Sequence, residues 1–108
     1  MKKFIKATDI PRSNRLWKYS NPKISQKMAH KYYGKNAVLY KSTKRDKKYM
    51  IETPDGRFVH FGQLGYEDYT KHRNKTRRKN YRTRSAKIRG DWKHDKYSAN
   101  NLARQVLW

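Results

Sequence analysis

Short apolar runs separated by polar turn signals in the middle of the chain predict a small antiparallel sheet. Three short runs rich in aromatic and β-branched residues lie at residues 38–40, 49–53 and 57–61. A polar turn at residues 43–47 separates the first two runs. The Pro-Asp-Gly sequence at residues 54–56 separates the last two, because Pro presets its backbone and Gly accepts a positive φ. We therefore predict a three-stranded antiparallel meander.

A short helix is predicted before the sheet, over residues 22–33. Asn21 can cap it, Pro22 suits its first position, and Gly34 can end it. Apolar residues recur within it at four-residue steps and predict one buried stripe. The members of this stripe are Ile24, Met28 and Tyr32, together with Ala29.

A second helix is predicted at the C-terminus, with Ser98 as its N-cap. Four apolar residues would share one side of this helix and pack on the sheet. They are Leu102, Ala103, Val106 and Leu107. Trp108 follows them, and we expect its large ring to dock in the core.

A long basic helix is predicted over residues 66–89, because this stretch contains no Gly or Pro and Gly90 follows it. Glu67 and Asp68 would lie in its first turn, where carboxylates favour the helix dipole. Its apolar content is thin, so we expect its ends to pack and its middle to project. Asp91 would begin the polar loop that follows.

Residues 1–20 predict an extended basic and aromatic arm, interrupted by Pro11. Its scattered apolar groups suggest that it binds another surface. A frayed terminus is an alternative of equal weight. Residues 21–108 are then a single small α+β domain, in which the basic helix and the C-terminal helix pack on the meander.

The amino-acid composition indicates which classes of partner such a domain binds. The 108 residues carry 29 Lys and Arg against 8 Asp and Glu, which gives a formal net charge of +21. A charge of this size indicates a nucleic acid or an acidic protein surface as partner. Aromatic residues make 14% of the chain, unlike a disordered basic tail, and there is no Cys to build a disulfide or a thiolate zinc site. No apolar run approaches the ~20 residues of a membrane span.

The strongest functional signal is the stretch from residue 71 to residue 89, which holds ten Lys or Arg and no Asp or Glu. We predict that it binds nucleic acid or another polyanion through the following side chains: Lys71, Arg73, Lys75, Arg77, Arg78, Lys79, Arg82, Arg84, Lys87 and Arg89. Tyr81 lies among them and could stack on a base or anchor the helix. Basic residues would occupy all sides of the helix, which favours phosphate contacts over base reading.

Catalytic chemistry has little support in the sequence. The eight carboxylates are scattered, and the four His residues show no metal-binding spacing. The segment at residues 62–65 lacks the Lys and Ser or Thr of a phosphate loop. We therefore expect no enzyme, catalytic residue, metal site, cofactor or small-molecule substrate.

A series of short segments runs in a fixed order through residues 35–108. The segments are Lys48-Tyr49-Met50-Ile51, Pro54-Asp55-Gly56, Val59-His60-Phe61-Gly62, Gly65 to His72, Arg77-Arg78 with Tyr81 and Arg84, Gly90-Asp91-Trp92, Tyr97-Ser98, Asn101-Leu102 and Leu107-Trp108. Together they resemble a family of short basic proteins of unknown function encoded by large double-stranded DNA viruses of algae and protists. The resemblance implies a viral protein packaged in the virion and offers no catalytic residue.

Two functions then compete. One is a minor capsid protein on the capsid interior, which bridges viral capsid proteins and contacts the genome. The other is a sequence-independent DNA-condensing protein, or an RNA-binding protein of ribosomal type. The aromatic arm at residues 1–20 favours the capsid function, and the basic stretch at residues 71–89 favours nucleic-acid binding. We expect the protein in the virion, on the capsid interior, and in the host cell during assembly.

Overall fold

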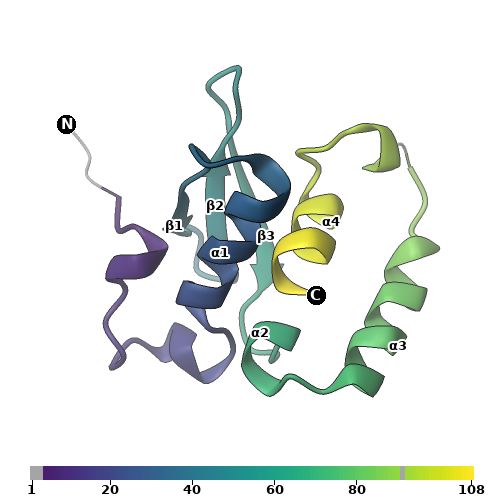
Figure 1. The fold of residues 1–108 in the computed structure, drawn as a ribbon, viewed down its shortest axis with the longest axis horizontal. Helices are drawn as coiled ribbons and strands as arrows, with labels where there is room; N and C mark the ends of the chain where they lie inside the picture. Colours follow the sequence, from purple (N-terminus) through teal and green to yellow (C-terminus); the bar gives the residue numbers. More distant parts are fainter. Residues whose placement is uncertain (1–3, 91) are drawn as a thin grey trace.

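Three antiparallel strands form a meander at the centre of the molecule (Figure 1). They are β1 (Leu39–Lys41), β2 (Lys47–Glu52) and β3 (Phe58–Gln63), in the order β1-β2-β3. The computed structural model describes residues 4–90 and 92–108, so residues 1–3 of the predicted arm and Asp91 lie outside the described residues. The α+β class and the meander are confirmed. The turn between β2 and β3 is closed by the Thr53 N–H, which donates to the Arg57 carbonyl at 2.7 Å.

Helix α1 (Pro22–Tyr33) has the predicted bounds, and the Asn21 side chain accepts hydrogen bonds from the N–H groups of Lys23 and Ile24. The predicted apolar stripe is wrong. Ile24 and Met28 are only half-buried and Tyr32 is 39% exposed.

The face of α1 that is buried is instead small and polar, and it consists of Pro22, Ser25, Gln26 and Ala29. Gln26 can be buried because its amide donates to the Ala37 carbonyl and accepts from the Leu39 N–H, each at 2.9 Å. Two satisfied hydrogen bonds offset the cost of removing the amide from water. The buried face of this helix was therefore decided by hydrogen-bond partners in β1 and in the segment just before it.

The N-terminal segment packs on this chain's own core. It contains two 3-10 turns, η1 (Ala7–Asp9) and η2 (Arg15–Lys18). Ala7, Ile10 and Leu16 are buried in the same cluster as the sheet residues, and the Lys41 N–H donates to the Ile5 carbonyl at 2.8 Å. We expected the apolar groups of this segment to bind another surface. These three instead pack in the core of the same chain.

The C-terminal helix is α4 (Ala99–Leu102), which continues as a π-helical turn, η4 (Ala103–Leu107). Ser98 caps it by accepting from the Asn101 N–H at 3.2 Å, as predicted. Its four apolar residues are buried, and the helix lies beside α1 over one face of the sheet (Figure 1). Trp108 is half-buried at the edge of this core, where its ring stacks on Tyr81.

The predicted helix over residues 66–89 is broken into α2 (Tyr69–His72) and α3 (Lys75–Ala86). Arg73 ends α2 in the left-handed region at φ 56°, and the Asn74 side chain caps α3 by accepting from the Arg77 N–H at 3.1 Å. Asn at an N-cap stabilises a new helix start by roughly 1 kcal/mol, which helps to offset the strain at Arg73. A third 3-10 turn, η3 (Trp92–His94), lies in the loop before Ser98. No helix in the described ranges is long and apolar enough to span a membrane.

Candidate nucleic-acid interface

Helix α3 carries most of the predicted binding residues and is fastened along its length to the C-terminal helix. Its inner side is a stripe at three- and four-residue steps that contains Arg78, Tyr81, Arg82 and Ser85. The Tyr81 ring stacks on Trp108, with centroids 4.3 Å apart and planes 12° apart. The middle of the helix therefore packs rather than projects, which corrects the sequence prediction.

Two arginines of the basic stretch at residues 71–89 hold α3 against the C-terminal helix. The Arg78 Nε donates to the main-chain oxygen of Trp108. Arg82 donates to the Arg104 carbonyl at 3.0 Å, and Arg104 donates back to the Arg82 carbonyl at 2.7 Å and also to Ser85 Oγ. Charge-assisted hydrogen bonds of this kind are stronger than neutral ones. Burial, and then the charges of Arg104 and Arg78, lower the pKa of Arg82.

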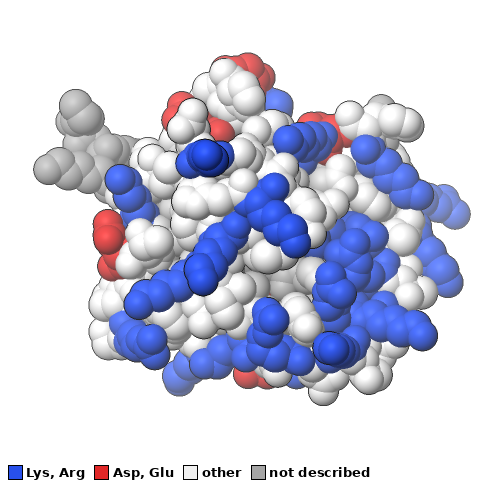
Figure 2. All heavy atoms as spheres, viewed as in Figure 1, with Lys and Arg blue, Asp and Glu red and all other residues white. Residues whose placement is uncertain are grey.

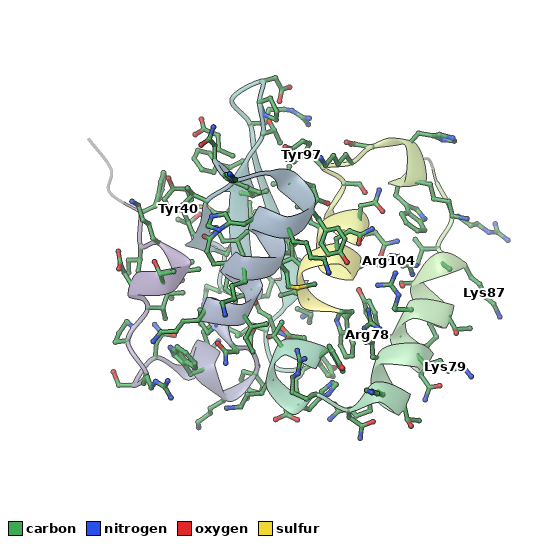
Figure 3. The ribbon with its side chains drawn as sticks, in the orientation of Figure 1. Tyr40, Arg78, Lys79, Lys87, Tyr97 and Arg104 are labelled. Atoms are coloured by element: carbon green, nitrogen blue, oxygen red, sulfur yellow. The ribbon has the colours of Figure 1, made fainter. Side chains whose placement is uncertain are left out.

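The other eight predicted residues are exposed. They are Lys71, Arg73, Lys75, Arg77, Lys79, Arg84, Lys87 and Arg89. Figure 3 shows Lys79 and Lys87 pointing away from the C-terminal helix, whereas Arg78 and Arg104 lie between the two helices. Figure 2 shows Lys and Arg side chains over the side of the molecule that α3 forms and also across the face that α1 forms. The structure thus separates the run into two residues that hold the helix and eight that face solvent.

Local interactions engage two of these exposed cations without burying them. Arg77 pairs with Glu67 at 3.3 Å, with both side chains 40–50% exposed, and Arg73 lies over the Tyr69 ring at 4.4 Å from the centroid. An exposed pair of this kind is worth only about 0–1 kcal/mol. Helix α3 itself contains no carboxylate, and its first turn carries Lys75 and Arg77 near the positive end of the helix dipole. A bound anion would relieve this local repulsion.

A groove of about 1190 Å³ is lined by residues of α3, the sheet and the C-terminal helix. Its apolar lining includes Phe61, Ile88 and Leu107, and its basic lining includes Lys47 and Arg84. Glu67 is the carboxylate in this lining, and it already pairs with Arg77. Tyr66 stands at the groove with 71% of its surface exposed. The groove combines apolar side chains with a lining of net positive charge.

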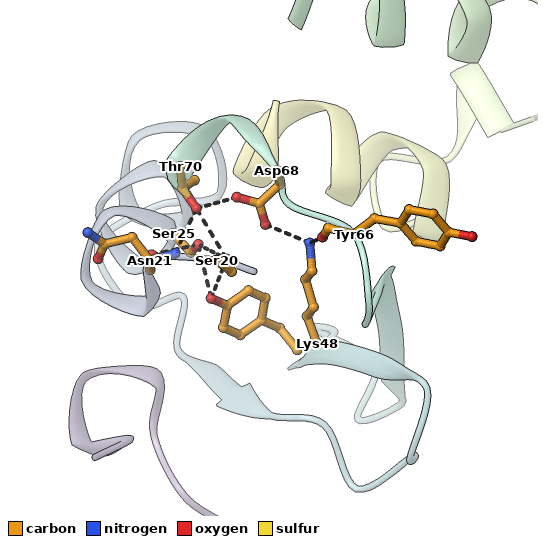
Figure 4. Close-up of polar contacts among 8 residues, drawn as sticks. Ser20, Asn21, Ser25, Lys48, Tyr66, Asp68 and Thr70 are labelled. Carbon is orange, nitrogen blue, oxygen red and sulfur yellow. Dashed lines mark hydrogen bonds and ion pairs between the residues drawn. The ribbon is translucent and has the colours of Figure 1, made fainter. Parts of the chain in front are cut away.

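An ion pair that the sequence analysis missed lies under the start of α2 (Figure 4). The Lys48 ammonium donates to Asp68 Oδ2 at 3.0 Å and to the Tyr66 carbonyl at 2.6 Å. Lys48 is 3% exposed and Asp68 is fully buried. Burial lowers the pKa of Lys48, and the Asp68 carboxylate opposes that shift. Asp68 was expected in the first turn of a helix, and it occupies the N-cap of α2 with its side chain turned to Lys48 and Thr70.

Hydroxyl groups extend this ion pair into a buried network. Thr70 bonds to Asp68, Ser20 Oγ lies 3.1 Å from Thr70 Oγ1, and the Tyr49 hydroxyl donates to Ser20 at 2.7 Å. Burial raises the pKa of the Tyr49 hydroxyl. The network is enclosed and joins the N-terminal segment, β2 and α2, so its role is to hold these elements together.

In the part of the chain that the structure describes, no group of three or more His, Cys, Asp or Glu residues is arranged to hold a metal ion. His60 Nδ1 lies 2.7 Å from Ser42 Oγ, and His72 Nδ1 accepts from the Asn74 N–H at 2.9 Å. Asp55 accepts from Thr53 and Arg57 in the turn, and these two hydrogen bonds lower its pKa.

Residues 37–85 match the model of a family of unknown function (DUF5754). The matched region runs from the start of the sheet to the end of α3, so it includes both Lys48 and Asp68 and most of the exposed cations. No curated protein matches the chain. No solved structure matches it either.

Proposed function

We propose that this protein is a non-enzymatic virion protein that binds nucleic acid through its phosphates without reading the base sequence. One observation carries the proposal: a carboxylate-free helix, fastened by Arg78 and Arg82, presents exposed cations to solvent. Fixing the helix before binding lowers the entropy lost when phosphates are contacted. The cations continue beyond both ends of α3, to Lys71 and Arg89, so they track an extended backbone better than one groove.

The proposal that the protein lies in the virion rests on the resemblance to short basic proteins of large DNA viruses. Within a capsid, a net charge of +21 would neutralise packaged genome phosphates on the interior side. The nucleic-acid partner is then non-specific, and the protein reaches the virion from the host cell during assembly. No cofactor or small-molecule substrate enters this function.

Binding of the purified chain to labelled duplexes tests the proposal. Fluorescence anisotropy with several unrelated sequences should give similar affinities, and neutralising about six phosphates predicts a log–log salt slope of roughly −5. The double variant Lys79→Glu/Lys87→Glu should weaken binding to all sequences alike. Lys23→Glu/Lys27→Glu on the exposed side of α1 changes the net charge equally and serves as the control. A strong preference for one sequence, or binding that salt does not weaken, would overturn the proposal.

A second function, the bridging of capsid proteins, is supported by the groove beside α3. The N-terminal segment no longer supports it, because Ala7, Ile10 and Leu16 are buried within the chain. The apolar and basic side chains that line the groove suit an acidic segment of a capsid protein with aliphatic side chains. Locating the protein in particles before and after genome release separates the two functions. Retention in emptied shells would support capsid bridging, and loss with the genome would support nucleic-acid binding alone.

A further inference from the structure

A second basic hollow lies between the N-terminal segment and the turn that joins β1 to β2. Its volume is about 630 Å³. Six cations line it, and they are Arg15, Lys41, Lys44, Arg45, Lys47 and Lys48. No Asp or Glu is among its lining residues, and none of the six belongs to the charge run at residues 71–89. The remaining polar lining comes from neutral groups such as Ser42 and Thr43.

Most cations that line this hollow form no ion pair among the described residues, and Asp46 lies between Arg45 and Lys47 in the same turn. The ion pairs formed among the described residues are three, and they involve Lys48, Arg57 and Arg77. Lys48 is neutralised by Asp68, which leaves five of the six lining cations outside these pairs. Five cations gathered around one concavity repel one another, and an anion with several charged oxygens would remove that repulsion.

The turn that carries Lys44 and Arg45 is held in place by hydrogen bonds. The Lys44 N–H donates to Ser42 Oγ at 3.0 Å, and the Ser42 N–H donates to the Lys48 carbonyl at 3.1 Å. Ser42 Oγ is in turn 2.7 Å from His60 Nδ1. The backbone of the site is therefore formed before a ligand arrives, which reduces the entropic cost of binding.

We propose that this hollow is a second phosphate-binding site, which lets one molecule hold two separate nucleic-acid segments together. The proposal rests on the proposed function, because α3 supplies the first contact. In Figure 1 the N-terminal segment, one wall of the hollow, lies on the opposite side of the molecule from α3. A protein with basic sites on two sides bridges strands, and bridging is the physical basis of condensation.

Electrostatics around His60 agree with this assignment. Burial lowers the pKa of His60, and the charges of Lys44 and Lys47 lower it further. Both lysines line the hollow, so the imidazole senses their positive field. Phosphate bound there would offset that field and raise the pKa of His60. The His60 ring thus reports occupancy in NMR titrations.

Energy transfer between two duplexes, one carrying a donor and one an acceptor, tests the bridging. Full-length wild type should bring the duplexes together. The variant Lys44→Glu/Arg45→Glu alters two residues that line this hollow and do not line the α3 groove. It should abolish energy transfer between the duplexes. Its affinity for a single duplex should stay near that of the Lys23→Glu/Lys27→Glu control. Equal transfer in the hollow variant and the control would overturn the inference, as would no transfer by wild type that binds single duplexes. Failure of wild type to bind any duplex would instead overturn the proposed function. Thermal unfolding checks that each variant is folded.

The source of the phosphate is distinguished with the Lys79→Glu/Lys87→Glu variant, in which α3 is weakened. A shift of the His60 resonances on addition of a short duplex would support a nucleic-acid site. A shift with inorganic tripolyphosphate and none with the duplex would overturn the bridging proposal in favour of a free polyphosphate ligand. No shift with either probe would overturn the site itself.

Discussion

The Lys48 ammonium and the Asp68 carboxylate meet at 3.0 Å in the interior, between strand β2 and the start of α2. Together the two side chains anchor the segment that leads into the basic helix. The Asp68 N–H also donates to the Tyr19 carbonyl at 3.0 Å, which ties the same point to the N-terminal segment. The start of α2, which leads into α3, is therefore held by an ion pair that includes none of the α3 cations.

Removal of one partner of this pair should unfold the protein or come close to it. Lys48→Met leaves Asp68 buried and unpaired, and Asp68→Asn does the same to Lys48, so each should cost roughly 3–5 kcal/mol. The double variant Lys48→Met/Asp68→Asn should lose less than the sum of the two, because it buries no net charge. Urea unfolding followed by circular dichroism measures the cycle. Additive losses would show that the two side chains do not interact.

Trp108 should hold α3 against the C-terminal helix. Trp108→Ala removes the ring that stacks on Tyr81, and because the ring is only half-buried we expect a loss of about 1–3 kcal/mol, below that of a core aromatic. Amide hydrogen exchange should rise in α3 more than in β2. Tyr66→Ala removes an exposed ring and provides the control. Unchanged exchange in α3 would show that the stack does not hold the helix.

Gly62 should not tolerate a side chain. It lies in β3 at φ +82°, and a Cβ there would stand 2.8 Å from Leu107 Cδ1. Gly62→Ala should therefore destabilise the fold by about 2–4 kcal/mol, through backbone strain and overpacking. Gly34 also has a positive φ, of +98°, but a Cβ at that position meets nothing within 4 Å. Gly34→Ala thus isolates the backbone contribution, and equal unfolding midpoints for the two variants would exclude a clash with Leu107.

Stability should fall on acidification below neutral pH. Burial, followed by nearby positive charges, lowers the pKa of both His60 and His72 in the folded state. Between these lowered values and the ordinary 6.5, the unfolded chain binds more protons, so the free energy of unfolding rises with pH through that window. The stabilisation is complete above pH ~6.5 and is lost as the pH falls through the folded-state values.

Urea unfolding at several pH values measures this dependence. His60→Gln/His72→Gln should flatten the dependence of the unfolding free energy on pH below pH ~6.5. His72 adds a structural reason, since its Nδ1 accepts from the Asn74 N–H and would lose that bond on protonation at this atom. An unaltered slope in the double variant would assign the acid sensitivity to other groups.

Local signals in the sequence determined much of the fold. The Asn21-Pro22 start of α1, the Ser98 cap and the turn at residues 54–56 were predicted, because caps and turns depend on groups within a few residues. The meander followed from the same turns and the three short apolar runs. The charge run was visible as composition. Asn74 was an available signal for a new helix start, and it was missed because the absence of Gly and Pro indicated one continuous helix.

Tertiary contacts decided which side of each element is buried. Ser25 and Gln26 are buried in place of Ile24 and Met28 because Tyr49, Ala37 and Leu39 supply their hydrogen-bond partners. The sequence therefore determined the elements and the number of charges. Only the tertiary structure decided that Arg78 and Arg82 hold α3 and that Lys48 meets Asp68, because these partners lie 20 or more residues apart and nothing in their local sequence specifies the contact.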